Sequence, residues 1–181
     1  MPSQLAPHEI NIRSQCFYIA RTVSTCWHCG SPTALVAIAV PPGHETLDVD
    51  DEVLDDDTQH REPVAATWSI ADHNAFLFFV DFLPAAIQDR INQYLPSYRP
   101  IGGAAAAAAG SGSGSYWSNH CESCGSQLDD HELFCEPGGA FLPTGESTAA
   151  AIHLEMVGEP FESFAAGYAY EPQYFGAMAR G

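Results

Sequence analysis

The hexapeptides CWHCGS (26–31) and CESCGS (121–126) are two copies of one pattern, CxxCGS. In each copy, two cysteines three positions apart precede a glycine, which can adopt a positive φ and turn the chain back. Such a turn, called a knuckle below, directs both sulfur atoms toward one point and lets backbone amides donate hydrogen bonds to the thiolates. Two knuckles supply the ligands of a tetrahedral four-sulfur zinc site. The predicted ligands of one structural zinc per chain are Cys26, Cys29, Cys121 and Cys124.

The composition suits one globular domain over residues 1–181, since 46% of the residues are hydrophobic and can form a substantial core. The chain has no run of about 18 apolar residues, and Met1–Ile12 does not resemble a secretory leader. We therefore expect a cytoplasmic protein. In that compartment its six cysteines are reduced and available to a metal, rather than paired as disulfides.

The charge is strongly negative: 23 acidic residues stand against 6 basic ones, which gives a formal net charge of −17. Phosphate binding depends on clustered lysines and arginines, so nucleic acid is an improbable partner. A basic protein is the partner class that this charge favours, although an acidic surface also serves solubility alone.

The first knuckle lies between two segments rich in β-branched and apolar residues, Phe17–Thr22 and Thr33–Val40. We expect them to form an antiparallel hairpin closed by the knuckle. Further strands are expected at Val64–Ser69 and Ala75–Phe82, with a buried helix as the alternative for the second of these. Apolar residues at helical spacing predict a helix over Pro84–Leu95 that packs on the sheet.

Two segments carry little signal for regular structure. The acidic stretch His44–Pro63 includes DVDDEVLDDD (48–57), whose like charges favour a solvated loop. Residues 102–115 read GGAAAAAAGSGSGS and predict a low-complexity spacer, which allows the second knuckle to reach the first.

Beyond the second knuckle we expect strands at Glu132–Glu136 and Ala151–Val157, and proline-initiated helices at Pro160–Ala166 and Pro172–Ala179. The expected fold class is therefore α+β. Antiparallel β-hairpins carry two zinc knuckles that share one zinc, and a section of β-strands and helix is inserted between them.

Other cysteines and histidines are weaker candidates for the metal. Cys16 and Cys135 are best interpreted as small buried hydrophobes. Cys135, His131 and His120 remain alternatives should one of them replace a predicted ligand.

The paired knuckles, with strands on both sides of the first, resemble the zinc-ribbon group of bacterial proteins, in which two knuckles on β-hairpins share one zinc. The segments Phe17–Arg21, Asn119–Cys124 and Cys135–Phe141 also resemble small proteobacterial proteins. The resemblance implies a metal-stapled scaffold and no particular reaction. Compared with ordinary ribbons, this chain has a long separation between its knuckles and is more acidic.

No catalytic pattern accompanies the knuckles. A redox CxxC requires a helix at its first cysteine, whereas Gly30 and a β-rich run follow here. The sequence His153-Leu154-Glu155 lies downstream of both knuckles, so it does not match a zinc deaminase, and HExxH is absent. We therefore expect a non-catalytic zinc-binding protein that contacts other proteins, such as an immunity protein, an antitoxin or an adaptor. The alternative is a zinc-dependent enzyme or regulator with an open metal position.

Overall fold

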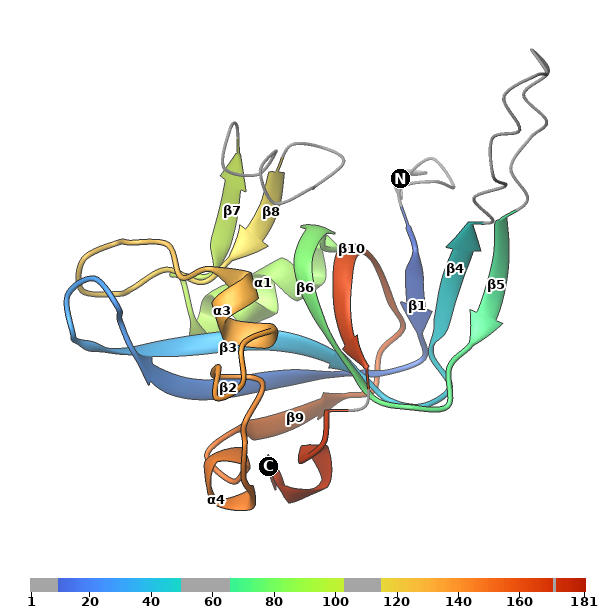
Figure 1. The fold of residues 1–181 in the computed structure, drawn as a ribbon. Coiled ribbons are helices and arrows are strands. Elements are labelled where there is room, and N and C mark those ends of the chain that lie inside the picture. The colour runs from blue at the N-terminus through green and yellow to red at the C-terminus, as the bar shows by residue number, and fades with distance from the viewer. Residues whose placement is uncertain (1–9, 50–65, 103–114, 171) are drawn as a thin grey trace, which may run out of the picture.

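The computed structural model describes residues 10–49, 66–102, 115–170 and 172–181. These residues are mostly β: 45% lie in strands, and the helices are few and short (Figure 1). The strands are β1 (Ile12–Ser14), β2 (Phe17–Thr25), β3 (Pro32–Val40), β4 (Glu45–Val49), β5 (Ala66–Ile70), β6 (Ala75–Phe82), β7 (Arg99–Gly102), β8 (Ser115–Ser118), β9 (His153–Val157), β10 (Phe161–Tyr170) and β11 (Ala179–Arg180). The helices are α1 (Ala85–Tyr94), α3 (Asp130–Phe134), α4 (Glu146–Ala149) and the 3-10 turn η2 (Phe175–Ala177).

The strands of the described residues form one mixed sheet in the order β11-β9-β2-β3-β6-β10-β1-β4-β5, with β8 also paired to β6 and β7 paired to β8. All of these pairings are antiparallel except that of β11 with β9. The long β10 connects the β11–β6 part of the sheet to the β1–β5 part, because its first residues pair with β1 and its remaining residues pair with β6. The α+β class expected from the sequence is therefore wrong, and the fold is predominantly β.

Three local expectations behind that class fail. Pro160 suggested a helix, but β10 begins at Phe161 and its first residues are buried alternately, which is the period of a β-strand. Glu132–Glu136 suggested a strand, but α3 forms there because the Asp129 side chain caps it, accepting a hydrogen bond from the His131 N–H at 2.7 Å. The helix expected at Pro172–Ala179 is reduced to η2, after which β11 begins.

Expectations for the first half of the chain are mostly confirmed. β2 and β3 form the predicted hairpin, paired from Tyr18 and Ala39 to Thr25 and Pro32. β6 is a strand rather than a buried helix, and α1 occupies the predicted helix position.

The predicted acidic loop and the predicted spacer lie only partly within the described residues. At the start of the loop, His44 is buried and the residues after it form β4, so this part was predicted wrongly. Its residues 50–63 lie outside the described residues, as do 103–114 of the spacer. Among the described helices, none has the length and apolar character needed to cross a membrane.

Buried side chains gather in two clusters, one on each face of the central strands. One cluster joins Phe17, Ile19 and Val36 to Ile87 and Ile91 of α1. The other joins the alternate residues of β2 and β3 to α3, α4 and η2. Because the two faces are both covered, β3 is almost continuously apolar. The central hairpin is thus a rigid support for the knuckle at its end.

Candidate metal centre

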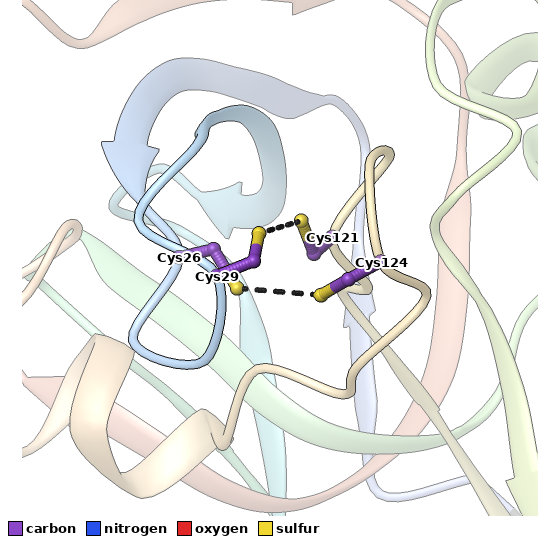
Figure 2. A group of neighbouring side chains, drawn as sticks. All are labelled: Cys26, Cys29, Cys121 and Cys124. Carbon is purple, nitrogen blue, oxygen red and sulfur yellow. Dashed lines mark hydrogen bonds between the residues drawn. The ribbon is translucent and has the colours of Figure 1, made fainter.

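The first knuckle closes the β2–β3 hairpin, and the second follows β8. The two loops lie beside each other at the free end of that hairpin (Figure 1). All four predicted cysteines point toward one another from these loops (Figure 2). Their four Sγ atoms all lie within 4.8 Å of one another.

Both knuckles have the same backbone geometry. Cys26 N–H donates to Ser31 O at 2.9 Å, and Cys121 N–H donates to Ser126 O at 2.8 Å. In each knuckle the glycine N–H donates to the carbonyl of the first cysteine at 2.9 Å. Gly30 has φ +72° and Gly125 φ +73°, the left-handed conformation that the pattern predicted. The CxxCGS sequence thus determines the shape of the turn locally.

Two of the sulfur–sulfur distances match those of a tetrahedral metal site. Cys26 Sγ lies 3.8 Å from Cys124 Sγ, and Cys29 Sγ lies 3.7 Å from Cys121 Sγ (Figure 2). A metal–sulfur distance of about 2.3 Å in a tetrahedron places sulfur atoms about 3.8 Å apart. Each close pair joins the first cysteine of one knuckle to the second of the other, so the arrangement is approximately two-fold symmetric. One cysteine of each pair is buried and the other is exposed.

Hydrogen bonds independent of any metal hold the second knuckle against β3. β6 pairs with β3 only at Ile38–Val40, and beyond that point the side chain of Asn119 takes the place of a pairing strand. Its Oδ1 accepts from Val36 N–H and its Nδ2 donates to Val36 O, both at 2.9 Å, and Asn119 is only 1% exposed. Glu122 N–H donates to the buried Thr33 hydroxyl at 3.1 Å.

Nearby N–H groups stabilise the thiolates. The backbone N–H groups of Cys124 and Ser123 lower the pKa of Cys121 to about 6 against the opposing effect of burial. Ser126 lowers the pKa of Cys124 through its hydroxyl and its backbone N–H. At Cys26 the backbone N–H of Cys29 acts in the same direction, but burial and the neighbouring sulfurs raise its pKa to about 11. Nearby hydrogen-bond donors therefore favour the thiolate form of Cys121 and Cys124, whereas burial and neighbouring sulfur atoms disfavour that of Cys26. A divalent cation bound among the four sulfur atoms would favour the thiolate form of each cysteine.

The other candidates do not belong to the four-cysteine group. Of the His, Cys, Asp and Glu residues that the structure describes, the four knuckle cysteines are the only group of three or more close enough to hold one metal ion. His120 is buried, and its Nδ1 lies 3.0 Å from Ser118 O and 3.2 Å from Ser97 O. Its ring is thus engaged by carbonyl groups. Cys16, Cys135 and His131 are not part of the cluster.

Sequence reasoning missed Asn119 and Thr33, which position the second knuckle. Neither residue is conspicuous in the sequence, because Asn119 lies between the polar residues Ser118 and His120, and Thr33 begins the apolar run of β3. Neither belongs to the four-cysteine group, so metal-ligand patterns do not find them.

Comparisons of the chain with protein-family models, with curated proteins and with solved structures found no match. Chemical interpretation of the site therefore depends on its own geometry. Four sulfur atoms lie close together, compatible with a structural metal site.

Proposed function

We propose that this chain is a non-catalytic zinc-binding protein in which one zinc ion joins the β2–β3 hairpin to the segment after β8. The observation that carries the proposal is the tetrahedral sulfur spacing at the knuckles, 3.8 and 3.7 Å for the two close pairs. Four thiolates are typical of structural zinc sites, which leave no position for a catalytic water. The same ligand set also accepts iron, and zinc is proposed because the paired knuckles resemble those of zinc ribbons.

A structural role agrees with the position of the site. The two knuckles are about 95 residues apart in sequence by their first cysteines, Cys26 and Cys121. Closing so long a loop is entropically costly, and a metal that binds only the folded arrangement stabilises it. The proposed zinc thus fixes one end of the sheet.

The partner we propose is a basic protein, as for an immunity protein, an antitoxin or an adaptor. The support is the formal charge of −17, to which four thiolates and one divalent cation add −2. A field of this sign accelerates encounter with cations and repels nucleic acid. The resemblance to bacterial zinc-ribbon proteins is consistent with a scaffold that presents a binding surface.

Metal analysis tests the site. We expect one zinc per chain in the purified protein, lost in Cys26→Ser and in Cys121→Ser. Cys16→Ser and Cys135→Ser are matched controls, because these cysteines lie outside the cluster, and they should retain zinc. Full zinc retention in both knuckle variants would contradict the proposal.

Cobalt substitution separates this function from the alternative, a zinc enzyme or regulator with an open position. A closed four-thiolate tetrahedral spectrum supports a structural site. A spectrum with a water ligand and fewer than four thiolates favours the alternative.

Salt dependence tests the proposed partner. Capture of basic proteins should weaken as salt shortens the screening length to about 8 Å near physiological ionic strength. It should also weaken when five acids outside the described residues are changed to asparagine: Asp50, Asp51, Asp55, Asp56 and Asp57. Zinc content reports that the variant is folded. Recovery of the same partners at the same salt would assign the acidic segment to solubility alone.

A further inference from the structure

A groove lies on the α1 face of the sheet, between the C-terminal part of α1 and the outer part of the β2–β3 hairpin. Its volume is about 650 Å³. Pockets for small organic ligands are typically about 300–1,000 Å³ and mostly apolar. Val23 and Ala34 line it from the sheet, and Tyr94 and Leu95 line it from α1. The groove therefore has the size and the lining of a ligand site.

Apolar surface is unusually exposed here. Val23 is 67% exposed and Tyr94 46% exposed, and they are two of the five large hydrophobic residues exposed within the described part of the chain. Both line the groove. Exposed apolar side chains gathered around a concavity indicate a contact surface.

A cation lies at the edge of this apolar surface. The Arg21 guanidinium lies 4.9 Å from the centre of the Tyr94 ring, and its Nη2 is 3.3 Å from a Glu155 carboxylate oxygen. Its Nε is buried and has no hydrogen-bond partner among the described residues. The side chain as a whole is 43% exposed, so the accessible part of the guanidinium has capacity for a further acceptor.

The titratable residues that line the groove are basic or neutral. Arg21 and His153 belong to the lining, and no aspartate or glutamate does. This absence of acids is notable in a chain with 23 acidic and 6 basic residues. The lining itself thus carries no negative charge, and Glu155, which pairs with Arg21, lies outside it.

We propose that the groove binds a small monocarboxylate with an apolar body. The carboxylate accepts a charge-assisted hydrogen bond from the part of the Arg21 guanidinium that Glu155 leaves free, and the apolar part covers Val23 and Ala34. A single negative charge suits the site because Glu155 already pairs with part of the guanidinium. None of the four cysteines lines the groove, so this proposal does not require the proposed metal or partner.

Calorimetric titration of the metal-loaded full chain with octanoate and with octanol tests the proposal. Octanol has the same alkyl length without the charge. We expect saturable binding of one octanoate per chain, at least tenfold tighter than octanol. Arg21→Gln should weaken octanoate about tenfold or more and leave octanol unchanged.

Arg180→Gln is the matched control, because Arg180 also lies near aromatic rings, Tyr18 and Phe175, but does not line the groove. It should bind octanoate like the unmodified chain. Should Arg21→Gln fail to fold by circular dichroism, Val23→Glu decides, because it adds a repelling charge at an exposed position and should also weaken octanoate. The proposal is overturned by absence of saturable octanoate binding, by equal affinities for octanoate and octanol, or by unchanged octanoate affinity in the folded groove variant. An equal loss in Arg180→Gln also overturns it.

Discussion

The amide of Asn119 holds the second knuckle on β3, and its removal should weaken both the fold and the metal site. Asn119→Ala deletes two hydrogen bonds of 2.9 Å, one to the N–H and one to the C=O of Val36. Both Asn119 and Val36 are 1% exposed, so water does not readily replace the lost partners. The variant leaves a buried backbone donor and a buried backbone acceptor unpaired.

The expected loss follows from those two groups. An unsatisfied buried polar group costs about 1–3 kcal/mol, so the pair costs roughly 2–6 kcal/mol. A whole domain has a free energy of unfolding of about 5–15 kcal/mol, so the effect is large. Because the backbone after Asn119 leads directly into Cys121, the variant should also release zinc more readily.

Denaturant unfolding of the metal-loaded protein measures the stability, and competition with a chromophoric chelator measures zinc affinity. Asn11→Ala is a matched control elsewhere in the sheet. Asn11 Nδ2 donates to Ala165 O at 2.8 Å, and its Oδ1 accepts from Ala165 N–H at 2.9 Å. This control loses the same kinds of hydrogen bond far from Cys121 in the sequence.

We expect both variants to have a lower free energy of unfolding. Only Asn119→Ala should also lose zinc affinity beyond the amount that its lower stability explains. A loss below about 0.5 kcal/mol in Asn119→Ala would refute the assigned role of the amide. Equal zinc affinity in the two variants at equal stability would refute its link to the knuckle.

Three further predictions concern the metal, a buried acid and a knuckle glycine. Chelation should lower the melting temperature by about 10 °C or more, because structural zinc contributes roughly 10–16 kcal/mol in zinc-finger peptides. An unchanged melting curve after verified metal removal would argue against a structural role. Burial raises the pKa of Asp130 to about 7 from 3.8, so the folded state retains a proton that the unfolded state releases, and this residue lowers stability as pH rises from about 4 to about 7. Asp130→Asn should therefore gain up to about 4 kcal/mol relative to the unmodified chain between pH 4 and pH 8 in urea titrations. Gly125→Ala should lower the free energy of unfolding, measured with denaturant, by about 1–2 kcal/mol, because a φ of +73° disfavours a side chain. The cost is in the backbone alone, since a Cβ at Gly125 meets no atom within 4 Å. Gly145→Ala, at a glycine with extended backbone, is the control and should lower it less.

The sequence alone predicted the knuckles, because their geometry is decided within six residues. Gly30 and Gly125 adopt the expected positive φ, and the hydrogen bonds that shape each turn close inside the CxxCGS hexapeptide. The β2–β3 hairpin was also predictable, because its strands flank one knuckle and carry β-branched and apolar residues throughout. These features depend on neighbours in the chain.

The α+β class failed because the later elements depend on distant partners. β10 is a strand because β6 and β1 pair with it, and a side chain at Gly167 would collide with the Phe78 ring of β6. No local pattern around Pro160 contains that information, and the proline signal alone favoured a helix.

The meeting of the two knuckles is likewise a tertiary result. The duplicated pattern showed that four sulfur atoms suit one metal, but not how the second knuckle reaches the first. That depends on the free edge of β3, where Val36 offers a donor and an acceptor that Asn119 satisfies. Local sequence thus determined the shape of each half-site, whereas buried hydrogen bonds between residues 83 positions apart decided that the halves face each other.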